Sequence, residues 1–220
     1  MQRKLVGVLL AFLGPVFWTG AAAAIPAGTV LAVSGPCIDH GRVLKRGDAV
    51  RANDTLTVPT GSHLQLRMAD GSVISVAPGS SLTVARYNIG GTGRYVRLLL
   101  PKGLLRVHVP PVGGPSAFVV ATAAGTASVR SGSADWFIQA QAGSAQVGVL
   151  AGTVDLTSAV TGQSVSIPSH WGTRNEAGLD PVLPRRWARR EFNRVIRLTS
   201  VAILSNQSWQ QRIFATGHFQ

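Results

Sequence analysis

The stretch Thr60–Val84 alternates hydrophobic and polar residues in short runs that are separated by turn signals. Such alternation is typical of β-strands with one buried and one solvent-exposed face. Asp70-Gly71 and Pro78-Gly79 lie between the runs and suit tight turns, because glycine tolerates positive φ and proline fixes φ. The pattern predicts three short antiparallel strands, centred on residues 64–68, 74–76 and 82–84.

A related pattern recurs along much of the chain: a glycine, two residues, an aliphatic residue, one residue and another aliphatic residue. It starts at unequal intervals, at Gly28, Gly61, Gly71, Gly79 and Gly162. Short strands of this kind cannot bury a face alone, so they must stack on one another. The pattern predicts an all-β fold with many short strands, in either a solenoid-like or a sandwich arrangement.

Further strands are expected on both sides of a cluster of helix and strand breakers at Pro110–Pro115. Before it, Tyr95–Leu100 and Leu104–Val109 read as two separate strands. After it, Gln163–Ile167 reads as the last strand of the β domain. Because the strand pattern continues past the breakers, the cluster is interpreted as a loop within one domain.

The character of the chain changes after Asp180, where a basic amphipathic helix is predicted over Arg185–Leu198. Apolar residues gather near one face of this helix and arginines cover much of the rest. Of the 21 Lys and Arg residues, seven lie in Arg185–Gln220, against one acidic residue, so this segment dominates the net charge of +12. The residues proposed for contact with a partner are Arg185, Arg186, Trp187, Arg189, Arg190, Arg194 and Arg197.

Three interpretations of the basic segment remain open. It can contact an anionic membrane surface or cell-wall polymer. It can bind nucleic acid, which export and the lack of an aromatic-interleaved basic groove disfavour. It can also be a helix that docks through its apolar face and leaves its arginines in water.

The first 24 residues are typical of a secretory signal. Arg3 and Lys4 precede an apolar core at Leu5–Trp18, and Ala22-Ala23-Ala24 fits a cleavage site before Ile25. We therefore expect a periplasmic or secreted protein, cleaved after Ala24. The alternative is an uncleaved membrane anchor, although the apolar core is short for a membrane span.

Chemistry-bearing residues are present, but their spacing selects no active site. The single cysteine, Cys37, excludes an intramolecular disulfide; it is either a reactive thiol or a small buried side chain. None of the five histidines has the spacing of a metal motif, and no nucleophile elbow occurs. Arg130 and Asp135 are placed to pair across a turn. No catalytic residue, metal ligand or cofactor is predicted.

An ordered set of short motifs resembles the FecR domain family. The motifs span Gly28–Gly172, and two positions, Ala123 and Ser131, depart from the family pattern. The set comprises Gly47-Asp48, Thr60-Gly61-Ser62, Leu64-x-Leu66, Asp70-Gly71-Ser72, Pro78-x-Ser80-x-Leu82, Leu100–Val107, Phe118–Thr122, Ala127–Gly132 and Gly152-Thr153-Val154.

The resemblance implies a FecR-type β domain over residues 25–175, after a signal peptide at 1–24 and before a basic helical segment at 176–220. It favours a solenoid-like arrangement of the strands. In signalling members, this domain lies on the outer side of a membrane-bound regulator, takes a signal from an outer-membrane transporter and passes it to a sigma factor inside. We expect a non-enzymatic envelope module that binds envelope proteins or peptidoglycan and other polysaccharide. The alternative is a membrane-anchored signalling adaptor.

Overall fold

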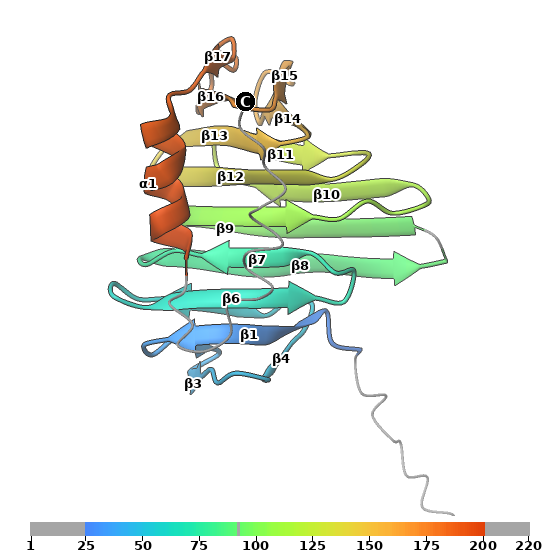
Figure 1. Cartoon of the computed structure of the whole chain (residues 1–220), viewed down its shortest axis with the longest axis vertical. Helices are drawn as coiled ribbons and strands as arrows, with labels where there is room; N and C mark the ends of the chain where they lie inside the picture. The colour runs from blue at the N-terminus through green and yellow to red at the C-terminus, as the bar shows by residue number, and fades with distance from the viewer. Residues whose placement is uncertain (1–24, 92, 201–220) are drawn as a thin grey trace, which may run out of the picture.

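The computed structural model describes residues 25–91 and 93–200, which form an elongated stack of β-strands with one helix along its side (Figure 1). Seventeen strands belong to one connected sheet. Their pairings divide into two ladders that share the long strand β9 (Gly93–Val109). We call them the helix-side ladder and the opposite ladder.

The helix-side ladder lies next to α1 (Arg189–Thr199). In spatial order it consists of β4 (Ala49–Val50), β1 (Gly28–Ser34), β6 (His63–Met68), β7 (Val73–Val76), β9, β12 (Ala134–Gln141), β13 (Ser144–Ala151), β16 (Trp171–Glu176) and β17 (Arg185–Arg186).

The opposite ladder faces it across the core. In spatial order it consists of β3 (Arg42–Val43), β2 (Ile38–Asp39), β5 (Thr55–Val58), β8 (Ser80–Gly90), β9, β10 (Ser116–Ala121), β11 (Gly125–Val129), β14 (Thr153–Ser158) and β15 (Ser164–Pro168).

The core lies between the two ladders and is continuous from end to end. Leu64 and Leu66 of β6 meet Leu82 and Val84 of β8 in one apolar cluster, and all four side chains are fully buried. The alternation over residues 64–84 therefore places its apolar face as predicted, and the turns at Asp70-Gly71 and Pro78-Gly79 form with positive φ at both glycines.

Strand β9 crosses from one ladder to the other. Its first half pairs with β8 and β10 in the opposite ladder, and Gly103–Val109 pairs with β7 and β12 in the helix-side ladder. Gly103 has φ of 108°, and a Cβ there would lie 2.1 Å from Ser80 Oγ. A glycine is therefore required where β9 changes ladder, because a side chain would be strained and would also collide with β8.

The structure confirms the predicted fold class, an all-β domain followed by a C-terminal helix. It corrects three predictions about the strands. The solenoid-like alternative is wrong, because among the described strands only β9 and β10 pair in parallel and the other pairs are antiparallel. The two strands expected at Tyr95–Leu100 and Leu104–Val109 are one strand. Gln163–Ile167 is not the last strand, because β16 and β17 follow it.

Several predictions lie outside the described residues: the signal peptide at 1–24 and everything after Ser200. Among residues 25–91 and 93–200, α1 is the one α-helix, and it is too short and too charged to cross a membrane. The domain boundaries at 25, 175 and 176 stay predictions.

Candidate binding groove beside the C-terminal helix

One indole ring, that of Trp187, packs between the C-terminal helix and the sheet. Gly148 of β13 and Gly172 of β16 face each other in register, and Trp187 lies on the bare backbone that they leave. A Cβ at Gly172 would lie 2.3 Å from Trp187 Cε2, and one at Gly148 would lie 2.5 Å from Phe137 Cζ and 3.2 Å from Trp187 Cζ3. The paired glycines therefore form a slot that only the absence of both side chains keeps open.

The rings of Trp187, Phe137 and Phe192 contact one another in an apolar cluster between α1 and the helix-side ladder, separate from the main core. Phe137 of β12 has its ring centroid 5.3 Å from that of Trp187 and 6.2 Å from that of Phe192. Phe192 and Val195, one turn apart on α1, are buried together with Leu104. Aromatic pairs at such distances add to the free energy of burying their apolar area.

The first turn of α1 is fixed by Glu191. Its Oε2 accepts a hydrogen bond from the Ala188 N–H at 2.7 Å, and its Oε1 accepts one from Arg185 Nη2 at 2.9 Å. The hydrogen bond from Arg185 is the largest cause that lowers the pKa of Glu191. The helix consequently begins at Arg189, four residues later than predicted, and Arg185 and Arg186 form a short strand instead.

A groove of about 340 Å³ runs between α1 and the outer face of β12 and β13. Its base is apolar, from Leu104, Phe137, Trp187, Val195 and Leu198, and its walls are polar, from Gln139, Gln141, Gln146, Glu191 and Arg194. Two smaller hollows of about 190 and 220 Å³ adjoin it, and all three share Gln146. Gln139 and Gln146 face each other across the two strands, so their amides form the centre of the groove.

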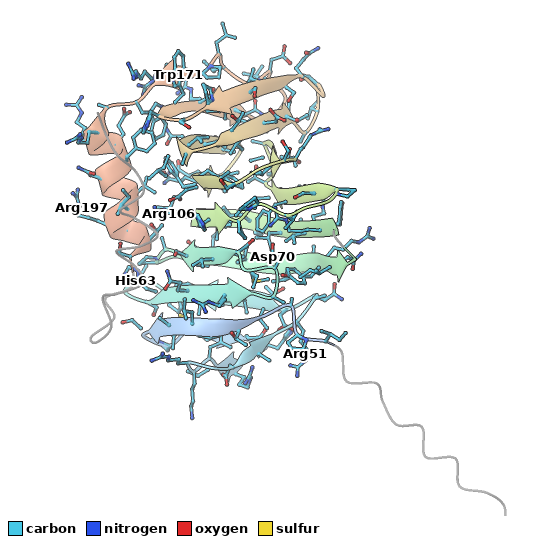
Figure 2. The ribbon with its side chains drawn as sticks, turned by 45° about the vertical axis from the view of Figure 1, so that its right-hand side comes forward. Arg51, His63, Asp70, Arg106, Trp171 and Arg197 are labelled. Atoms are coloured by element: carbon cyan, nitrogen blue, oxygen red, sulfur yellow. The ribbon has the colours of Figure 1, made fainter. Side chains whose placement is uncertain are left out.

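Of the arginines predicted for partner contact, Arg194 lines this groove and Arg185 lines an adjoining hollow. Arg185, Arg186, Arg189, Arg190, Arg194 and Arg197 are all exposed, and Arg197 lies on α1 in Figure 2. Arg185 also stacks over Trp187, with its guanidinium carbon 5.7 Å from the ring centroid. Trp187 differs from its predicted neighbours, since it is only 9% exposed and holds the helix in place.

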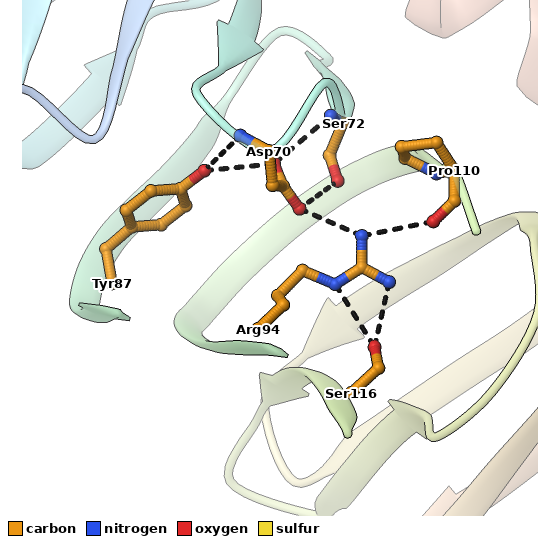
Figure 3. Close-up of polar contacts among 6 residues, drawn as sticks. All are labelled: Asp70, Ser72, Tyr87, Arg94, Pro110 and Ser116. Carbon is orange, nitrogen blue, oxygen red and sulfur yellow. Dashed lines mark hydrogen bonds and ion pairs between the residues drawn. The ribbon is translucent and has the colours of Figure 1, made fainter. Parts of the chain in front are cut away.

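A polar cluster separate from the groove joins the turn at Asp70 to neighbouring strands (Figure 3). Arg94 donates to Asp70 Oδ2 at 3.0 Å, to the Pro110 carbonyl and to Ser116 Oγ. Tyr87 donates to Asp70 Oδ1 and accepts the Asp70 N–H, and burial raises the pKa of its hydroxyl. Because every member bonds to another, the cluster connects the turn at Asp70 to β8 and β9 and offers no unpaired nucleophile or base.

Asp135 pairs with a different partner from the one expected. Its carboxylate accepts two hydrogen bonds from Arg106 of β9, at 2.6 and 2.9 Å. Arg130 instead lies 3.8 Å from Asp155. The expected Arg130–Asp135 pair is wrong because β12 pairs with β9, which places Arg106 closer than the residue across the turn.

The fold defines a class: an all-β domain with a docked C-terminal helix. Residues 54–155 match the family described as FecR protein. The resemblance seen in the sequence is thus confirmed. A search of curated proteins found no match.

Two crystal structures of a candidate anti-sigma factor from Parabacteroides distasonis ATCC 8503 have a similar fold. Each has a TM-score of 0.51, at 18% and 17% sequence identity. Each match covers 63% of this chain and 62% of that chain, so it spans less than two thirds of the similar protein. At this identity the likeness concerns the fold.

Proposed function

We propose that this protein is a non-enzymatic signalling regulator of the FecR type, which binds a protein partner on the outer side of the membrane. The FecR domain and the fold shared with a candidate anti-sigma factor support a regulatory function. The groove beside α1 is the observation that connects this function to particular residues, because apolar and hydrogen-bonding side chains both line it and one wall is the basic helix.

The chemistry of the groove favours binding over catalysis. Glutamine amides do not titrate, so Gln139, Gln141 and Gln146 supply no general acid or base. The one carboxylate that lines the groove, Glu191, already accepts hydrogen bonds at both oxygens, from Arg185 and the Ala188 N–H. Each amide both donates and accepts hydrogen bonds, as the backbone of a bound peptide requires. The apolar base offers area for a side chain of that peptide, and exposed arginines at the rim favour an acidic partner.

An envelope scaffold that contacts cell-wall glycan is the second candidate. Amide side chains also bind sugar hydroxyls, and the exposed arginines of α1 would attract anionic polymer or lipid through charge. Charge attraction of this kind weakens as salt is added, whereas an apolar peptide contact does not. The two candidates therefore differ in the consequence of blocking the groove, and a peptide that fills the apolar base should keep more of its affinity in high salt than anionic polymer does.

Gene expression in the host is the test of the regulatory function. Deletion of the gene should change the expression of a defined set of genes, and the wild-type chain should restore it. Gln146→Arg, which fills the centre of the groove, should fail to restore it. Gln163→Arg, an exposed glutamine before β15 in the opposite ladder, is the matched control and should restore it. Unchanged expression after deletion would overturn the proposal.

Binding to purified peptidoglycan and to anionic liposomes tests the scaffold. The triple variant Arg190→Gln, Arg194→Gln and Arg197→Gln should lose any salt-sensitive binding. The control carries the same change at three exposed arginines away from α1, Arg46, Arg67 and Arg97. Equal loss in both variants would mean general charge attraction. The N-terminal sequence of the exported protein, expected to begin at Ile25, tests the proposed localisation.

A further inference from the structure

We propose that Asp39, His40 and Asp54 form a binding site for one divalent transition-metal ion, with Zn²⁺ as the best match to the ligand types. The site lies in the opposite ladder, at the end of the sheet away from the groove, and is independent of the proposed regulatory function. Sequence reasoning missed it because Asp54 is distant from the other two residues and no motif spacing joins them.

Two turns bring the three side chains together. Asp39 ends β2, and the hairpin to β3 turns at His40 and Gly41, which both have positive φ as a two-residue hairpin requires. Asp54 precedes β5, which pairs with β2 and places Leu56 opposite Asp39. The turn that carries Asp54 is fixed to β8 by a hydrogen bond from the Val84 N–H to the Asp54 carbonyl at 3.0 Å.

The spacing of the donor atoms fits an ion better than direct hydrogen bonds. His40 Nε2 lies 3.8 Å from Asp39 Oδ1 and 3.9 Å from Asp54 Oδ1, and the three ligand atoms all lie within 4.8 Å of one another. These distances exceed those of N–H···O hydrogen bonds. The separations of 3.8 and 3.9 Å are compatible with an ion that lies about 2.0–2.2 Å from His40 Nε2 and from a carboxylate oxygen.

A buried oxygen without a hydrogen-bond partner faces the site. Asp39 is 7% exposed, and its Oδ1 accepts no hydrogen bond. The other oxygens are held away from the site: Asp39 Oδ2 lies 3.8 Å from Arg42, and Asp54 Oδ2 accepts the Arg51 N–H at 2.7 Å. In both carboxylates, contacts made by Oδ2 orient the group so that Oδ1 lies toward His40. Metal-binding carboxylates are commonly oriented by hydrogen bonds in this way.

The charges around Asp39 also favour a cation. The Asp39 carboxylate is buried and lies near the negatively charged carboxylate of Asp54. A bound cation would offset both effects. Arg42 acts against it, because its guanidinium lies near Asp39 and also pairs with Asp48 at 3.2 Å. The site therefore has ligand types that suit Zn²⁺ and one nearby positive charge, that of Arg42. Removing the Arg42 charge should strengthen metal binding.

Calorimetric titration of the full chain with Zn²⁺ tests the site. We expect one ion per chain. His40→Gln and Asp54→Asn should each weaken binding by about tenfold or more, and Arg42→Gln should tighten it. Co²⁺ should give the visible absorption of a nitrogen- and oxygen-ligated ion, and His40→Gln should abolish it. At a Zn²⁺ concentration of about 100 Kd, Tm should rise by about 5–10 °C.

Asp155→Asn, a carboxylate of the opposite ladder that pairs with Arg130, is the matched control and should bind as the wild type does. His40 is largely exposed, so its replacement leaves the fold intact and the comparison meaningful. The proposal is overturned if the wild type binds no Zn²⁺ up to about 1 mM. It is equally overturned if His40→Gln and Asp54→Asn bind as tightly as Asp155→Asn, because the ions would then occupy other histidines.

Discussion

Arg94 and Asp70 carry opposite charges where water does not reach them, since both side chains are 1% exposed. An ion pair in such a place stabilises a fold only when its remaining donors and acceptors are bonded, because desolvation opposes the attraction. Here Ser72, Tyr87, Pro110 and Ser116 supply those bonds. The pair therefore holds the turn at Asp70 against β9.

Removing one partner of this pair should be costly. We expect Arg94→Met to destabilise the protein by about 3–5 kcal/mol, because the Asp70 carboxylate would stay buried without its counter-charge. Urea denaturation measures the change. Tyr87→Phe, which removes one hydrogen bond and no charge, should cost about 1–2 kcal/mol. A loss below that of Tyr87→Phe would contradict the interpretation of Arg94 as an essential counter-charge.

Cys37 is fully buried, and burial raises the pKa of its thiol to about 11. Of the two interpretations of this residue, the buried side chain is thus the one that the structure supports. At pH 7 the thiol is protonated and shielded, so iodoacetamide should label it slowly in the folded protein and quickly in denaturant. Rapid labelling of the folded protein, measured by mass spectrometry, would contradict this.

At the scale of elements, the attachment of α1 depends on the slot between two strands. Gly172→Ala should displace Trp187 and release the helix, while the two ladders stay paired. Hydrogen exchange should then accelerate over residues 189–199 and remain unchanged in β6 and β9. Gly113→Ala, at a loop position with open space, is the control and should change neither. Unchanged exchange in α1 would mean that the other apolar contacts suffice.

Local patterns predict single elements well in this chain. The alternation at residues 64–68, 74–76 and 82–84 depends on neighbours in sequence, and the strands form there. The apolar face of the C-terminal helix was equally visible, and Phe192 and Val195 pack as that face requires. The resemblance to FecR domains also rests on local motifs and is confirmed.

Pairing between distant elements was less predictable, because period-two alternation does not say which strand lies next to which. The solenoid-like alternative, the Arg130–Asp135 pair and the division of β9 into two strands were wrong for that reason. The groove was missed as well. Gln139 and Gln146 become neighbours only through the β12–β13 pairing, and α1 closes the groove from another part of the chain.

At the scale of the whole molecule, β9 is the strand on which both ladders depend. It pairs with four strands, two of them before it in the chain and two after it. The segment between β9 and β10 contains the breaker cluster at residues 110–115, and the polypeptide on either side of it forms one half of the stack.

A single cut in that segment would divide the protein into two pieces with matching edges. Residues 25–112 would present β9 with one free edge in each ladder, and residues 113–220 would carry β10 and β12, which complete those edges. Each piece alone would expose unpaired backbone and aggregate readily. When the two pieces are mixed, they should reassemble without a covalent link, because β10 and β12 of the second piece can pair with the free edges of β9 in the first.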